Sequence, residues 1–129
     1  MNQAIAVDKA TLQAHRDAMA TPLAEIARFL QEVLSRRLTA YIVGVGDGKT
    51  VSRWASGEVT EIRDHETEQR LRTAYEIARL LLVGDAPQTV KAWFIGLNPE
   101  LGDVAPAEAI RNGQSRETIA AARAFLIGG

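Results

Sequence analysis

The 129-residue chain contains no cysteine, so it can form neither disulfides nor thiolate metal sites, and it lacks a common catalytic nucleophile. Aromatic residues make up only 5% of the sequence. β-Branched residues do not alternate with polar ones, and Ala, Leu, Arg and Glu dominate, which favours helices over strands. We therefore predict an all-α fold without a sheet.

Long hydrophobic runs are also absent. No apolar run reaches the roughly 18 residues that a membrane-spanning helix needs. The first 20 residues lack the apolar core of a signal peptide and carry several ionisable groups, namely Asp8, Lys9, His15, Arg16 and Asp17. We expect a soluble, cytoplasmic protein.

The charge of the chain is small overall and uneven along the sequence. A net charge of −1 argues against a protein that coats nucleic acid over its whole surface. The segment 35–57 nevertheless carries four cations and a single carboxylate, Asp47. Such a local basic face indicates a nucleic-acid partner, although an ordinary solvated surface would fit it too. The four cations are Arg36, Arg37, Lys49 and Arg53.

Apolar residues recur every three or four positions along most of the chain, which predicts a series of helices. Residues 1–20 form either a weak, Ala-rich helix or a mobile arm. Thr21 and Pro22 are suited to be the N-cap and first residue of the next helix. Further helices are predicted over 36–43, 49–55 and 64–83, from an Asp85 cap to Leu97, from Pro106 to 112, and from Ser115 to the C-terminus.

The helix predicted over 64–83 is apolar over much of its circumference. A helix of this kind is buried on two sides, as expected of one that bridges two halves of a protein. In the helix that follows it, the predicted buried face consists of Val90, Trp93, Phe94 and Leu97.

The segment Leu38–Gly57 reads as two short helices joined by a glycine-containing turn, which is the helix-turn-helix arrangement. Val51 and Trp54 lie on one face of the second helix, and we expect them to be structural. The opposite face can reach base edges and phosphates. With Arg36 and Arg37, the predicted DNA-binding residues are Lys49, Thr50, Ser52 and Arg53.

Two stretches resemble parts of a known family. The run 51–57, VSRWASG, resembles the end of the helix-turn-helix of Xre-like transcriptional regulators, although the turn 44–49 is one residue longer than in that pattern. Ala92-Trp93-Phe94, the turn 97–102, the segment 106–113 and a terminal helix through Phe125 resemble, in that order, the toxin-binding domain of the MbcA/ParS/Xre antitoxins. The chain departs from the pattern at Phe94 and at Asp103, where a second glycine often follows Gly102.

The resemblance implies a type II antitoxin that neutralises a RES-domain, NAD-consuming toxin and represses its own operon. It also implies a partner toxin, duplex operator DNA, and either a homodimer or a hetero-oligomer with the toxin. We therefore predict an N-terminal arm or weak helix over 1–20, a helix-turn-helix DNA-binding region over 21–63, a bridging helix over 64–84 and a toxin-binding domain over 85–129.

The terminal helix and the loop near Asn98 are the predicted toxin-binding surface. The helix is slender and Ala-rich, so it could enter a concave pocket, and Arg123 could pair with acidic surroundings there. Alternatively, Phe125 and Leu126 complete the core of this chain, as we expect Trp93 to do. The predicted toxin-binding residues are Asn98, Arg123, Phe125, Leu126, Gly128 and Gly129.

An enzyme is the less favoured interpretation. Asp64, His65, Glu66 and Glu68 lie close together in the sequence, but carboxylates at the start of a helix more simply stabilise its positive end. We predict no enzyme, no cofactor and no metal. The alternative to an antitoxin is a stand-alone helix-turn-helix regulator whose C-terminal domain dimerises or binds another partner.

Overall fold

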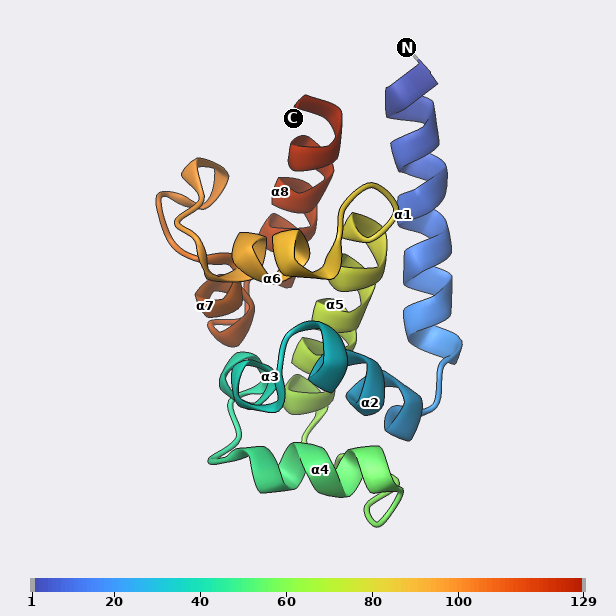
Figure 1. Cartoon of the computed structure of the whole chain (residues 1–129), viewed down its shortest axis with the longest axis vertical. Coiled ribbons are helices and arrows are strands. Elements are labelled where there is room, and N and C mark those ends of the chain that lie inside the picture. Colours follow the sequence, from blue (N-terminus) through green and yellow to red (C-terminus); the bar gives the residue numbers. More distant parts are fainter. Residues whose placement is uncertain (1, 129) are drawn as a thin grey trace.

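The computed structural model describes residues 2–128, and over this range it contains eight α-helices, one short 3-10 helix and no strand (Figure 1). The prediction of an all-α fold is confirmed. No helix among these residues is long and apolar enough to cross a membrane. The elements are α1 Asn2–Ala20, α2 Leu23–Val33, α3 Arg36–Val43, α4 Gly48–Ser56, α5 His65–Leu81, α6 Pro87–Ile95, η1 Pro99–Leu101, α7 Pro106–Arg111 and α8 Ser115–Gly128.

Helix α5 is the central element of the fold. It contacts α1, α2, α3, α7 and α8, and Figure 1 shows it in the middle of the molecule. From Leu71 to Leu81 every residue is buried except Arg72 and Arg79. Because the buried apolar residues of all these helices form one connected cluster, the N-terminal and C-terminal halves share a single hydrophobic core.

The N-terminal segment is a helix that docks on the rest of the protein. Val7, Ala14 and Ala18 are buried, and α1 packs against α5 and α8. The guanidinium of Arg72 on α5 donates hydrogen bonds to the backbone oxygens of Ala18 and Thr21, at 2.7 and 2.9 Å. Of the two options that the sequence left open, weak helix or mobile arm, the structure contains the helix.

Two predicted helix starts are wrong. Helix α2 begins at Leu23, with Pro22 in the cap position, and the hydroxyl of Thr21 instead donates to the backbone oxygen of Asp17. Helix α6 begins at Pro87, and Ala86 rather than Asp85 precedes it. The fixed φ of proline suits the first helical position, and this preference outweighs the capping tendency of the aspartate two residues earlier.

The predicted burial of Leu97 is also wrong, because 76% of this residue is exposed. Helix α6 ends at Ile95, and Gly96 has an extended backbone with φ −80° and ψ 154°. The helical register is lost at that point, so Leu97 leaves the face that buries Val90 and Phe94.

Replacement of Trp54 tests the packing of the N-terminal half. The Trp54 residue is only 3% exposed, within the common core. We expect Trp54→Ala to lower the free energy of unfolding by about 3–5 kcal/mol, because it removes a buried aromatic side chain and leaves a cavity. Urea denaturation followed by circular dichroism measures this. Val83→Ala, at a site that is 73% exposed, is the control and should change the value by less than about 0.5 kcal/mol. Equal stability of the two variants would contradict the packing described.

Candidate functional site

Helices α3 and α4 and the turn 44–47 between them, which we call the α3–α4 unit, have ends that are fixed by local hydrogen bonds. The hydroxyl of Ser35 accepts from the backbone N–H of Leu38 at 3.1 Å, at the start of α3. Gly44 ends α3 with φ +86°, a left-handed conformation that glycine adopts without strain. Asp47 caps α4 by accepting from the backbone N–H of Lys49 at 2.9 Å, as the sequence predicts. The turn therefore has a defined geometry.

Residues at the start of α5 hydrogen-bond to the end of α3 and cap α5 itself. The Nε of Arg70 donates to the backbone oxygen of Val43, at the end of α3, at 2.8 Å. Asp64 caps α5 and accepts from both the hydroxyl and the backbone N–H of Thr67. The hydrogen bond from the Thr67 hydroxyl, and to a smaller extent that from its backbone N–H, lower the pKa of the Asp64 carboxyl from its ordinary value. The cap is thus charged at neutral pH, which favours the start of α5.

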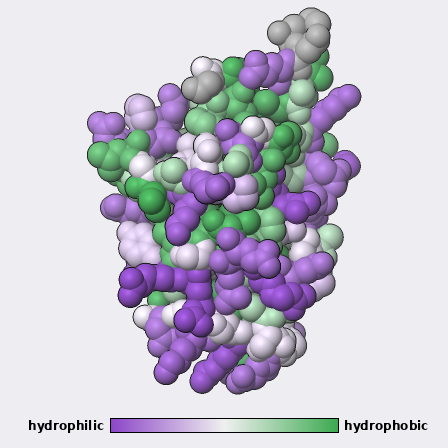
Figure 2. Space-filling model, in the orientation of Figure 1, coloured by the Kyte–Doolittle hydropathy of each residue, from purple (hydrophilic) through white to green (hydrophobic). Residues whose placement is uncertain are grey.

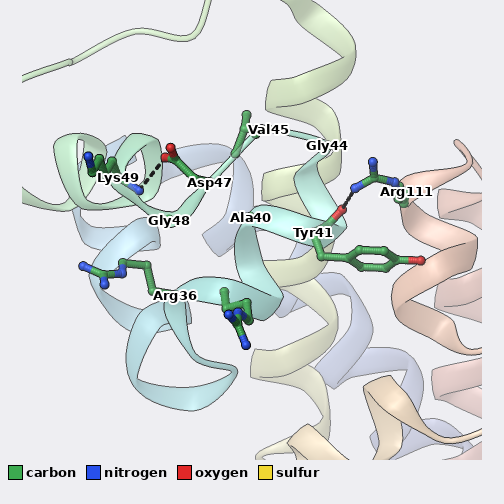
Figure 3. Close-up of a pocket in the computed structure, with 11 residues that line it drawn as sticks. Arg36, Ala40, Tyr41, Gly44, Val45, Asp47, Gly48, Lys49 and Arg111 are labelled. Carbon is green, nitrogen blue, oxygen red and sulfur yellow. Dashed lines mark hydrogen bonds between the residues drawn. The ribbon is translucent and has the colours of Figure 1, made fainter.

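A groove of about 700 Å³ lies beside the turn and is rich in positive charge (Figure 3). It brings together three of the predicted DNA-binding residues, Arg36, Arg37 and Lys49, all of them exposed. Its one carboxylate, Asp47, is occupied as the cap of α4. Among the described residues, none of these three cations forms an ion pair. The groove is therefore a positively charged surface open to an anionic partner.

Arg36 also connects the two helices of the unit. Its Nη1 donates to the hydroxyl of Ser52 at 3.0 Å, and that hydroxyl lies 3.4 Å from the amide oxygen of Gln31. Gly48 allows this approach, since a Cβ there would lie 2.8 Å from the Cγ of Arg36. Ser52 is half-buried and engaged within the protein, so it positions Arg36 rather than facing outward as predicted.

The remaining predicted DNA-binding residues lie on α4. Arg53 is one turn beyond Lys49 and is not among the residues that line the groove. Its Nε is 3.7 Å from a carboxylate oxygen of Glu58, and both side chains are more than half exposed, so this pair is weak. Thr50 is half-buried. Val51 and Trp54, on the opposite face, are buried.

One cation in the groove was not predicted from the sequence. Arg111 comes from α7 in the C-terminal half, yet its guanidinium donates to the backbone oxygen of Tyr41 on α3. The guanidinium carbon also lies 4.7 Å from the centre of the Tyr41 ring. The two residues are 70 positions apart, and no local pattern in the sequence signals their contact.

The loop near Asn98 is organised by Asn98 itself, which is buried. Its side-chain oxygen accepts from the backbone N–H of Glu100 at 2.9 Å, and its backbone oxygen accepts from Leu101 and Asp103. The turn then passes through Gly102 and Asp103 at φ +66° and +64°. Asn98 is therefore a structural residue of the turn, and little of it is left exposed for a partner.

Most of the predicted toxin-binding residues on α8 contact the chain itself. Arg123 forms an ion pair with Asp8 on α1. The ring of Phe125 lies 6.4 Å from that of Trp93, and Phe125, Trp93 and Leu126 are all partly buried against the core. Gly128 is exposed at the end of α8, and Gly129 lies outside the described residues.

Exposed apolar side chains lie at the end of α6, in the residues before η1 and at the end of α8. Ile95 and Leu97 are 56% and 76% exposed just before η1, and η1 packs against α8, where Ile127 is 42% exposed. Figure 2 shows hydrophobic residues at the left edge of the upper half, over the end of α6 and the loop that holds η1. We call Ile95 and Leu97 the α6-end patch. Sequence reasoning missed it because it assigned Leu97 to a buried helical face.

The ionisable residues near the start of α5 do not all belong to one site. Asp64 is the helix cap, whereas His65 and Glu68 line a second groove of about 510 Å³ together with His15 and Glu76. In that groove the Nδ1 of His15 is 3.2 Å from a carboxylate oxygen of Glu76. Within residues 2–128 no cluster of three or more His, Asp or Glu side chains is arranged to hold a metal ion.

Comparisons with known proteins leave the family of this chain open. No family model matches the sequence, and no match was found among curated proteins or among solved structures.

Proposed function

We propose that the chain is an antitoxin that binds operator DNA through the α3–α4 unit and neutralises a RES-domain toxin through its C-terminal half. The observation that carries the DNA-binding part is the groove beside the turn, where Arg36, Arg37 and Lys49 lie without an ion-pair partner among the described residues. The phosphate groups of DNA are anions that can bind such a positively charged surface beside the turn of a helix-turn-helix.

Helix α4 is the proposed recognition helix. Its buried face, Val51 and Trp54, fixes its orientation, so Lys49 and Arg53 project from the opposite face in known register. Both side chains are exposed, and basic side chains at such positions can contact guanine edges or phosphates. Arg36, held by Ser52, and Arg37 would contact the DNA backbone beside them.

The toxin-binding part of the proposal is supported by the order of motifs in the C-terminal half and by the backbone of the Asn98 turn. Gly102 and Asp103 both have left-handed φ values. A glycine after Gly102, which the antitoxin pattern often has, would adopt a left-handed φ without strain. Aspartate is among the other residues that tolerate a positive φ best. The exposed α6-end patch is the apolar surface that we propose contacts the toxin.

The first experiment concerns DNA. We expect Lys49→Ala combined with Arg53→Ala to abolish preferential binding to a duplex from upstream of the chain's own gene, because both proposed base-reading cations are lost. Fluorescence anisotropy with this duplex, and with a shuffled duplex of equal length, measures the preference.

The matched control is Lys9→Ala combined with Arg16→Ala, which removes the same two charges from exposed positions on α1. This control should keep the preference of the unmodified protein. Equal affinity of the unmodified protein for both duplexes would contradict operator recognition, and retained preference in the Lys49 and Arg53 variant would contradict the role of α4.

The second experiment concerns the toxin. We expect Ile95→Asp combined with Leu97→Asp to prevent the chain from co-purifying with a RES-domain toxin encoded beside it, and to stop it restoring growth of cells that express the toxin. A charge at each exposed site should leave the core intact but cannot be buried at an interface without a large penalty.

Val83→Asp, at another exposed apolar site, is the control and should still rescue growth. Rescue by the Ile95 and Leu97 variant at equal abundance would exclude the α6-end patch as the neutralising surface. Failure of the unmodified chain to bind the toxin, with operator binding intact, would favour a stand-alone regulator.

A further inference from the structure

Arg111 turns the groove beside α3 and α4 into a surface shared by both halves of the protein. It belongs to α7, which packs against α3, and it lies at the edge of the groove in Figure 3. With it, the groove is lined by four cations and by the single carboxylate of Asp47, which already caps α4. Across residues 2–128, Arg111 forms no ion pair.

The guanidinium of Arg111 is held in place rather than free to move. One nitrogen, Nη1, donates to the backbone oxygen of Tyr41, and the group lies over the Tyr41 ring at 4.7 Å. These two contacts fix its plane but use only part of its five N–H donors. An arginine fixed in this way loses little side-chain entropy when it binds an anion.

We infer that Arg111 is a phosphate-contacting residue, so that the DNA interface of the helix-turn-helix extends onto α7 of the C-terminal half. This inference rests on the proposed DNA-binding function. Arginine binds phosphate through paired N–H donors, and contacts to phosphate add affinity without reading sequence. Arg111 therefore strengthens binding to all duplexes alike, whereas Lys49 and Arg53 on α4 select among them.

The test is the salt dependence of DNA binding by Arg111→Gln. Loss of one phosphate contact should reduce the slope of log affinity against log salt by about 0.9, which corresponds to roughly fivefold weaker binding near 0.15 M salt. The reduction should be the same for the duplex from upstream of the gene and for a shuffled duplex. Anisotropy titrations between about 50 and 200 mM KCl measure both.

Two further variants separate charge from packing. Arg116→Gln removes another exposed arginine, on α8 and outside the groove, and should leave the slope unchanged. Arg111→Lys keeps the charge but loses the planar contact with Tyr41, and it should restore the slope. A Gln variant that weakens binding with an unchanged slope, or a Lys variant that binds like Gln, would assign Arg111 a structural role and overturn the inference.

The outcomes also separate this inference from the function on which it rests. If Arg111→Gln and Arg116→Gln bind alike while the unmodified protein still prefers its own duplex, the phosphate contact is wrong and the proposed function stands. If the unmodified protein binds neither duplex, the proposed function fails and the contact fails with it.

Discussion

The burial of α5 on nearly every side is the constraint on which the rest of the structure depends. Between Leu71 and Leu81 only two arginines reach the surface, and each fully buried aliphatic residue contributes about 1.5–3 kcal/mol through removal of apolar area from water. This helix contacts α1, α2 and α3 of the N-terminal half and α7 and α8 of the C-terminal half. A displacement of α5 would therefore disturb both halves together, and the chain cannot be divided into two independently packed domains without exposing this helix.

The shared core explains why residues distant in sequence meet at the proposed DNA interface. Helix α7 is positioned by its contacts with α3, α5 and α8, and this places Arg111 over Tyr41. Arg70 of α5 likewise holds the end of α3 at Val43. The turn between α3 and α4 is thus supported by α5 and α7, and two cations of the groove, Arg36 and Arg111, are held by hydrogen bonds to Ser52 and Tyr41. Preorganised cations of this kind bind phosphate at a smaller entropic cost.

Sequence reasoning predicted most of what depends on neighbouring residues. The helical spacing, the stop at Gly44, the cap at Asp47 and the burial of Val51 and Trp54 agree with the structure. It failed where two local preferences compete, as at Asp85 and Pro87, and where a helix ends earlier than its apolar pattern, as before Leu97. It could not find pairs that only the tertiary fold creates. Arg123, predicted to face a partner, pairs instead with Asp8 on α1, and Arg111, the groove cation that the sequence did not indicate, belongs to the C-terminal half.

Whether the α3–α4 unit is the surface that binds DNA can be measured by hydrogen exchange of the whole chain. Backbone amides would be followed by mass spectrometry with and without a duplex from upstream of the gene. We expect the duplex to slow exchange in the turn between Gly44 and Lys49 and along α4, with no change at the end of α6. Protection confined to α6, η1 and α8, with the turn unaffected, would contradict DNA binding by this unit.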